Sequence, residues 1–398
     1  MNQPILKTIL NNRKPGDRLT LKQMGTWPAN QHLFDEDSLW AIQAAWAARR
    51  PLLIQGEPGC GKSQLARAVA QAEQWAFIPT VIHHRSECTD LQWHFDAVAR
   101  LGSAQLLGFQ AATAGRPPAP DEARLAPDEA RLAPHEARLA PHEASPSSQG
   151  GSPAPAGTSA VDAAGAAAGA SPVPTGALEQ QLNPMRFLAP GPLWWTVNWQ
   201  SAAAQIARCE AGLQCVQPIT SHLNQPKATP AGRVLLIDEI DKAHVDLPNG
   251  LLEVLDNGGF SVPYRRAGYV GADDVQPLVI ITSNGERVLP QAFLRRCCVY
   301  TIQVPEDEGA FKAWLVTRAA AHFAVDPRFF PDVAAEAADF LWIVREAARR
   351  DQHPKPGQGE FLDLMRALLG LAATEAEQRE KLEKIAPYVV DKTQQVSG

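Results

Sequence analysis

One eight-residue segment constrains the fold of this chain more than any other. Residues 56–63 read Gly-Glu-Pro-Gly-Cys-Gly-Lys-Ser, which fits the pattern G-x-x-x-x-G-K-S/T. The glycines let successive backbone N–H groups converge on an anion with no Cβ in the way. A short apolar run at 51–54 precedes the segment, and an alanine-rich run at 64–72 follows it. This order predicts a buried strand, a phosphate-binding loop and a helix whose positive end points at the same anion.

The loop is therefore a candidate site for the phosphates of a nucleoside triphosphate. The expected binding residues are Gly56, Glu57, Pro58, Gly59, Cys60, Gly61, Lys62, Ser63 and Gln64. Lys62 is placed to reach the β- and γ-phosphates, and the Ser63 hydroxyl to bind Mg²⁺. Cys60 is either an oxidation-sensitive thiol or, as we favour, a small residue tolerated in the loop. Such a loop contacts phosphates only, so it does not reveal which base is preferred.

Two adjacent carboxylates follow a second apolar run, at 234–237. We expect Asp238, the first, to hold Mg²⁺ through water, and Glu239, the second, to polarise the attacking water as a general base. An apolar run before Asp-Glu is a weak signal alone, since strands commonly end in charged turns. Downstream of a phosphate-binding loop it indicates a hydrolysis site.

Polar residues also follow a third apolar run, at 278–282. Asn284 is predicted to orient the lytic water or to contact the γ-phosphate, rather than to serve only as a turn residue. Arg295 and Arg296 come just after a short helix expected from Leu289. They are either a solvated basic pair, or one of them is an arginine finger that completes a neighbouring subunit's site. Arg296 is the first choice for that role and Arg295 the second.

With these elements in order, the chain resembles the AAA+ ATPases and, within them, the MoxR-like branch. The resembling motifs are GEPGCGKS at 56–63, LLIDEIDKA at 235–243 and ITSNGERVLPQAFLRRC at 281–297. Two further segments, at 90–101 and 191–195, resemble MoxR-like proteins encoded beside partners with a von Willebrand factor A domain. The resemblance implies an α/β P-loop domain with a five-stranded parallel sheet, a small helical lid and a hexameric ring. It also implies ATP and Mg²⁺ as cofactors and a chaperone or remodelling role on a protein partner.

The resemblance also assigns individual roles. The motor residues that it implies are Lys62, Ser63, Asp238, Glu239, Asn284 and Arg296. The sequence departs from the pattern in the lid, where these proteins usually carry an arginine at the start of a helix. No arginine starts the segment 357–366, and Arg366 comes about two turns later. A nucleotide-dependent scaffold or switch with little hydrolysis, and a nucleic-acid or restriction-associated NTPase, stay open as alternatives.

The chain is expected to divide into an N-terminal segment at 1–33, a nucleotide-binding domain at 34–305 and a helical lid at 306–398. The stretch 111–176 is mostly Ala, Pro, Gly and Ser, and it contains a seven-residue repeat, APDEARL twice and then APHEARL. Proline in every repeat argues against a coiled coil. We interpret 111–176 as a disordered, low-complexity insertion in a surface loop.

Periodicity places the remaining elements. Helices are predicted at 35–50, 90–101 and 247–257, a strand at 77–82 and a hairpin at 260–277. A tryptophan-rich stretch at 187–200 is expected to pack in the core rather than to face a partner.

The composition of the chain disfavours several classes of binding partner. The net charge is -6 and no stretch is strongly basic, which disfavours nucleic acid as a ligand. The sequence shows no charged-then-apolar leader and no apolar run of membrane-spanning length, so a cytoplasmic protein without a membrane partner is expected. The six cysteines form no C-x-x-C pair, and His83, His84 and His94 show no metal-ligand spacing.

Overall fold

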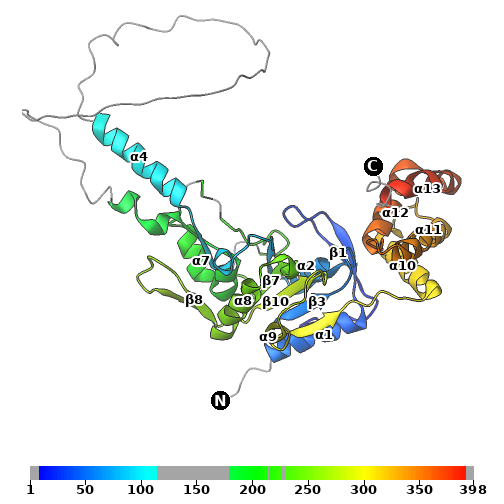
Figure 1. The fold of residues 1–398 in the computed structure, drawn as a ribbon, viewed down its shortest axis with the longest axis horizontal. Coiled ribbons are helices and arrows are strands. Elements are labelled where there is room, and N and C mark those ends of the chain that lie inside the picture. Colours follow the sequence, from blue (N-terminus) through cyan, green and yellow to red (C-terminus); the bar gives the residue numbers. More distant parts are fainter. Residues whose placement is uncertain (1–8, 114–178, 211, 214, 226–228, 391–398) are drawn as a thin grey trace, which may run out of the picture. The chain divides into compact units, whose positions relative to one another are not determined.

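The computed structural model describes residues 9–113, 179–210, 212–213, 215–225 and 229–390 (Figure 1). The chain divides into one unit made of Met1–Arg100 and Asn183–Gly398, and a second, Leu101–Leu182. Almost all of the insertion predicted at 111–176 lies outside the described residues.

A five-stranded parallel sheet forms the centre of the first unit, which confirms the predicted fold class. Its strands, in spatial order, are β11 (Cys298–Thr301), β3 (Leu52–Gln55), β10 (Leu278–Ser283), β7 (Arg233–Asp238) and β4 (Ala76–Val81). The three middle strands are almost wholly apolar because helices cover both faces of the sheet. Strand β10 pairs with both β3 and β7, so the carboxyl ends of these three strands lie side by side.

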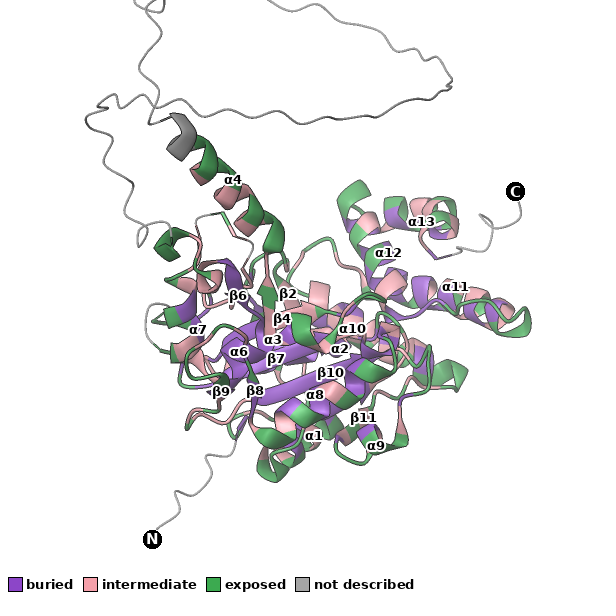
Figure 2. Cartoon of the chain, turned by 60° about the vertical axis from the view of Figure 1, so that its left-hand side comes forward, coloured by how far each residue is buried: buried purple, intermediate pink, exposed green. Residues whose placement is uncertain are grey.

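Each face of the sheet has its own core. Along β7, Val234 and Leu236 pack in one cluster, and Leu235 and Ile237 in the other, because successive side chains of a strand point to opposite faces. Helices α1 (Glu36–Ala48) and α2 (Lys62–Ala72) contribute to the first cluster, and α6 (Pro192–Val197) and α8 (Asp246–Asn257) to the second. Figure 2 shows the sheet buried between these helices.

The helix predicted at 90–101 is wrong. The chain instead forms α3 (Cys88–Gln92), β5 (Trp93–Phe95) and α4 (Ala97–Thr113). Strand β5 pairs antiparallel with β6 (Leu188–Pro190), and this long-range pairing overrides the local helical pattern. The Asp96 side chain then accepts a hydrogen bond from the Ala99 N–H at 2.7 Å, which starts the new helix.

The tryptophan-rich stretch packs in the core, as predicted. It forms η1 (Pro184–Phe187), β6, α6 and α7 (Trp199–Ile206). Trp194 is 1% exposed and Trp195 5% exposed. The rings of Trp195 and Trp199 lie 4.9 Å apart although they belong to separate helices.

Two short hairpins flank the sheet. Near the N-terminus, β1 (Arg18–Leu21) pairs with β2 (Asn30–Leu33), and Leu21 and Met24 are buried in the same cluster as α2. The hairpin predicted at 260–277 is confirmed as β8 (Gly259–Ser261) and β9 (Tyr269–Gly271), between α8 and β10. Two single-turn helices, η2 (Ile240–Lys242) and α9 (Gln291–Leu294), follow β7 and β10.

The C-terminal region is helical, as predicted. Helices α10 (Glu308–Phe323), α11 (Pro331–Arg350), α12 (Gln358–Leu371) and α13 (Glu375–Val389) share a separate hydrophobic cluster. We call these four helices the lid. Within the described ranges, no helix is both long enough and apolar enough to cross a membrane.

Candidate nucleotide-binding site

The phosphate-binding loop connects β3 to α2, in the order that the sequence predicts. Gly61 has φ +96° and caps the start of α2, a backbone conformation that L side chains rarely adopt. Gly59 has φ +75°, and a Cβ there would lie 3.2 Å from the Cα of Gly359 at the start of α12. Both positions therefore require glycine, one for the turn into the helix and the other for the approach of the lid.

Lys62 is folded back over the loop. Its Nζ donates to the carbonyl oxygens of Gly56 and Glu57, both at 2.8 Å, and the residue is only 6% exposed. These carbonyls satisfy two of the three ammonium donors. A bound phosphate would take over part of this coordination, because a charged oxygen is the stronger acceptor.

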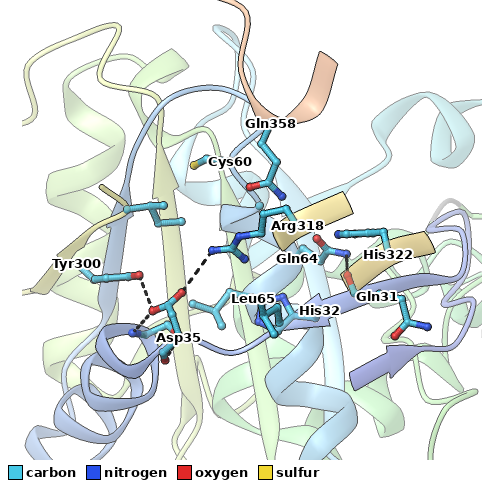
Figure 3. Close-up of a pocket in the computed structure, with 14 residues that line it drawn as sticks. Gln31, His32, Asp35, Cys60, Gln64, Leu65, Tyr300, Arg318, His322 and Gln358 are labelled. Carbon is cyan, nitrogen blue, oxygen red and sulfur yellow. Dashed lines mark hydrogen bonds and ion pairs between the residues drawn. The ribbon is translucent and has the colours of Figure 1, made fainter. Parts of the chain in front are cut away.

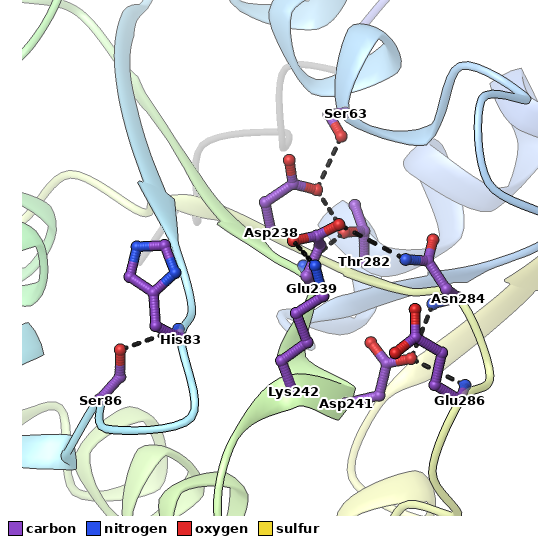
Figure 4. A network of polar contacts seen from close by, with 10 residues as sticks. All are labelled: Ser63, His83, Ser86, Asp238, Glu239, Asp241, Lys242, Thr282, Asn284 and Glu286. Carbon is purple, nitrogen blue, oxygen red and sulfur yellow. Dashed lines mark hydrogen bonds and ion pairs between the residues drawn. The ribbon is translucent and has the colours of Figure 1, made fainter. Parts of the chain in front are cut away.

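A hydroxyl and a carboxylate meet beside the loop, at the ends of α2 and β7. Ser63 Oγ donates to Asp238 Oδ1 at 2.7 Å, and Thr282 Oγ1 from β10 donates to the same oxygen (Figure 4). Thr282 Oγ1 also accepts from the Glu239 N–H at 2.9 Å. The sequence indicated Ser63 and Asp238 but not Thr282, which holds the two carboxylate residues in register with the neighbouring strand.

These oxygen donors fit Mg²⁺. The ion prefers oxygen ligands and usually keeps several waters, using one or two protein groups plus phosphate oxygens. The Ser63 hydroxyl and the Asp238 carboxylate share a hydrogen bond where such an ion would separate them. Over the part of the chain that the structure describes, no three His, Cys, Asp or Glu side chains gather into a cage for a metal.

Glu239 has an unusual backbone. Its φ of 61° and ψ of 47° lie in the left-handed region, which costs a non-glycine residue about 1–2 kcal/mol. Its Oε2 accepts from Lys242 Nζ at 2.7 Å, and Asn284 Nδ2 lies 3.5 Å from its Oε1 (Figure 4). Glu239 and Asn284 are therefore brought together as predicted. The Lys242 contact was not predicted, and its only sequence signal was its place in the segment 235–243.

A second unpredicted residue, Asp241, fixes the loop that carries Asn284. It is 2% exposed, and its Oδ2 accepts from the N–H groups of Asn284 and Glu286, both at 3.0 Å. Two charge-assisted bonds from one buried carboxylate hold the loop after β10 against the turn after β7.

A cavity of about 320 Å³ gathers most of the predicted residues. It is lined by Pro58, Gly59, Gly61, Lys62, Ser63, Gln64, Asp238, Glu239 and Asn284, together with Trp27, Pro28, Asn30 and Arg67. Arg295 and Arg296 are not among its lining residues. Arg296 is half-exposed and its Nε lies 3.1 Å from Asp256 Oδ2 on α8, and the Arg295 carbonyl accepts from Arg50 at 3.1 Å.

A second, narrower cavity shares Gly61 and Gln64 with the first and extends toward the lid (Figure 3). Two buried polar atoms among its lining residues have no partner, namely His32 Nε2 and Gln358 Oε1. Burial, with a smaller effect of Arg318, lowers the pKa of His32 to about 3, so its imidazole is neutral. Buried polar atoms without partners are uncommon in folded proteins and cost about 1–3 kcal/mol each. At about 20 Å³ this cavity has room for about one water molecule and none for a nucleoside.

Cys60 belongs to the same region but shows no sign of reactivity. It is 5% exposed, and burial raises the pKa of its thiol. Because the thiolate is the reactive form, a buried thiol in this state is inert. The structure favours the small-residue interpretation of Cys60.

The lid arginine that the resemblance leads one to expect near α12 is not at the loop. Helix α12 begins at Gln358, and Arg366, two turns along, pairs with Asp363 of its own helix at 2.5 Å.

Comparisons with known proteins add little to this geometry. No family model matches the sequence, and no curated protein matches it. Among solved structures, the chain is similar to a protein described as a candidate ATPase from Cytophaga hutchinsonii ATCC 33406. The identity is 10%, the match covers 89% of this chain and 80% of that chain, and the TM-score is 0.32. A similarity of this size carries no functional conclusion. The sheet, the loop and the strand-end residues of the chain itself define a P-loop α/β fold.

Proposed function

We propose that this chain binds ATP with Mg²⁺ at residues 56–64 and hydrolyses it. One observation carries the proposal: Lys62, Ser63, Asp238, Glu239 and Asn284 line a single cavity at the ends of three adjacent strands. Each residue type is the one that its chemical role requires. ATP rather than another nucleotide is preferred because of the resemblance to AAA+ proteins.

The roles follow from the contacts. Lys62 and the N–H groups of the loop bind the phosphates, and Ser63 and Asp238 hold Mg²⁺, which supplies charge neutralisation at the phosphate oxygens. Glu239 accepts a proton from the attacking water, and Asn284, 3.5 Å from its carboxylate, orients that water. Lys242 donates to the Glu239 carboxylate at 2.7 Å and fixes its orientation until water is in place.

The finer proposal is a ring-forming AAA+ ATPase of the MoxR-like branch that remodels a protein partner. Its support is the resemblance of the segments 235–243 and 281–297 to that branch. Arg296, half-exposed and held by Asp256, is available to a neighbouring subunit's site. A hexamer, a partner with a von Willebrand factor A domain and a cytoplasmic location are parts of this proposal.

The test is steady-state ATP hydrolysis across a range of protein concentrations, with Glu239→Gln as the inactive reference. A ring with a shared site predicts that turnover per subunit rises with concentration until assembly is complete, and sizing separates a fully assembled ring from a site that acts in cis. Arg296→Ala should lose about 10³–10⁵-fold in kcat. If the arginine acts in trans, mixing Arg296→Ala with Lys62→Ala subunits restores part of the turnover. Mixing that restores nothing contradicts a trans-acting Arg296.

A nucleotide-dependent scaffold or switch is the second candidate. The observation in its favour is that Lys62 and Glu239 are both already bonded within the chain. ATP binding without turnover at any protein concentration would support it. Binding to DNA that weakens steeply with salt would instead support a nucleic-acid NTPase.

A further inference from the structure

A lid arginine contacts the phosphate-binding loop. Arg345 of α11 donates from Nη2 to Glu57 Oε1 at 2.7 Å, across 288 positions of sequence. The arginine side chain is 9% exposed, whereas that of Glu57 is 36% exposed. The buried partner therefore comes from the lid and the more exposed one from the loop.

Arg345 is held rigidly within the lid. Its Nη1 donates to the Pro356 carbonyl at 2.9 Å, and its guanidinium lies 4.9 Å from the ring centre of Phe311, a fully buried residue of α10. The planar guanidinium makes all three contacts in one orientation. When the helices of the lid move, the Arg345 guanidinium therefore moves with them.

Glu57 links that charge to the phosphate-binding lysine. The Glu57 side chain accepts from Arg345, and its carbonyl oxygen accepts from Lys62 Nζ at 2.8 Å. The adjoining backbone also lies close to the lid, because a Cβ on Gly59 would lie 3.2 Å from the Cα of Gly359 and a Cβ on Gly359 would lie 3.3 Å from the Cα of Gly59. Arrival of phosphate at Lys62 thus changes a bond to the same residue that Arg345 holds.

We infer that Arg345 is a positioning residue that couples the lid to the nucleotide through Glu57. The inference rests on the proposed function and adds to it a route for regulation of the same site. Arg345 also neutralises the Glu57 carboxylate, which would otherwise repel the phosphates that the loop binds. In this arrangement Arg345 of α11 affects the loop through its contact with the Glu57 side chain and does not need to touch the nucleotide.

The test is a double-mutant cycle with Arg345→Met, Glu57→Gln and the double variant, in the full-length chain. KM and kcat for ATP are measured, together with hydrogen–deuterium exchange of peptides covering 351–362 with and without ADP. Each single variant should change KM or kcat about 2- to 30-fold, the usual range for a coupling residue. The double variant should cost no more than the larger single change, because both remove one contact. ADP should protect 351–362 in the wild-type protein and not in the variants.

The matched control is Arg349→Met, one turn further along α11, where the side chain is 56% exposed and lies 3.7 Å from Glu346. It should behave as wild type. Arg345→Lys keeps the positive charge but lacks the planar guanidinium with its several donors. It should therefore show more coupling than Arg345→Met and less than the wild-type protein. If Arg345→Met does not fold, the coupling is tested with Glu57→Gln alone, through its effect on hydrogen–deuterium exchange of 351–362.

Wild-type kinetics and ADP protection in both single variants would overturn the coupling and leave the ATPase proposal intact. Additive effects in the double variant would also overturn it. A wild-type protein that binds no nucleotide would instead refute the proposed function itself.

Discussion

Two sets of polar contacts meet at the phosphate-binding loop, and they differ in kind. On the sheet side, Lys62, Ser63 and Glu239 are bonded to groups that a nucleotide, a metal ion or water would replace. On the lid side, Arg345 and Arg318 are largely buried and lie over aromatic rings, 4.9 Å from Phe311 and 5.4 Å from Trp314. The hydrogen bonds of Arg345 to Glu57 and to the Pro356 carbonyl need no incoming ligand atom.

The sheet-side contacts are therefore the ones that a ligand replaces, and the lid-side contacts are the ones that carry a change at the loop to the lid. When a neutral ligand atom or water replaces a hydrogen bond on the sheet side, the new bond has similar strength and the change in free energy is small. The change becomes large when the incoming atom is charged, as a phosphate oxygen is. Lid-side bonds resist exchange, because removing one partner leaves a desolvated charge behind. We therefore expect ligand binding to rearrange the sheet side and to move the lid side as a body.

Lys62→Ala should have the largest effect and abolish nucleotide binding. The variant loses the charge that meets the phosphates and leaves the Gly56 and Glu57 carbonyls without their donor. Affinity for a fluorescent ATP analogue should fall by about 100-fold or more, since hydrogen bonds to charged groups are worth about 1.5–3 kcal/mol before the lost Coulomb attraction is counted. Lys384→Ala, an exposed lysine of α13, is the control. Retained affinity in Lys62→Ala would place the phosphates elsewhere.

Glu239→Gln should stop turnover while keeping nucleotide binding. The amide is nearly isosteric but cannot accept a proton, so kcat should fall about 10²–10⁴-fold. Glu253→Gln, an exposed glutamate of α8, serves as the control. Equal rates in Glu239→Gln and wild type would remove Glu239 from the role of general base.

Arg318→Met should mainly reduce stability, as expected of a lid-side residue. Its guanidinium lies over Trp314 and 3.9 Å from Asp35 Oδ2, with 14% of the side chain exposed. The loss should be about 1–2 kcal/mol in the free energy of unfolding, measured with urea. Asp35 keeps the Tyr300 hydroxyl as a donor at 3.0 Å, which limits the penalty. Arg266→Met, at an exposed position of the β8–β9 hairpin, is the comparison. No loss of stability in Arg318→Met would mean that the lid-side contact is as replaceable as those on the sheet side.

Acid should loosen the lid-side cavity. Burial lowers the pKa of His322 to about 4 and that of His32 to about 3, with Arg318 lowering both further. Below pH 6.5 the unfolded chain takes up protons that the folded chain resists. The stability contributed by these neutral histidines is therefore complete above pH 6.5 and declines as the pH falls toward 4, by at most about 1.4 kcal/mol per pH unit for each. His322→Gln should flatten the decline in urea unfolding measured at pH 7, 6 and 5. An unchanged slope would show that His322 takes up its proton at the same pH in the folded and the unfolded chain.

Deleting 111–176 should have the smallest effect. Strand β5 lies before the segment and strand β6 after it, and the two strands pair with each other. Halving the length of a connection changes the free energy of loop closure by only about 0.6 kcal/mol. ATP turnover and the unfolding midpoint should stay near their wild-type values. Loss of the folded state would show that the insertion is structural.

The sheet side was largely predictable from the sequence, because its residues follow from local rules. A loop between strand and helix presents Lys62 and Ser63, and the carboxyl ends of parallel strands place Asp238, Glu239 and Asn284 at one edge. No distant contact needs to be known for these assignments.

The lid side was not predictable, because it depends on packing between distant segments. The bond from Arg345 to Glu57 spans 288 positions, and nothing in the local sequence distinguishes this arginine from Arg349. The same limit explains the wrong helix at 90–101, where pairing of β5 with β6 decided the outcome. Asp241 and Lys242 lie within the motif at 235–243, but their hydrogen-bond partners are set by the turns after β7 and β10.

The β5–β6 pair has a consequence for how this gene changes over time. The Asp96 N–H donates to the Phe187 carbonyl at 2.9 Å, so the chain leaves and rejoins the fold at neighbouring points whatever the length between them. Near-identical repeats in that interval are prone to gain or lose whole copies when DNA strands slip during replication. Each such event keeps the reading frame and leaves the hydrogen-bonded junction untouched. We therefore expect the insertion to vary among natural isolates in steps of the seven-residue repeat.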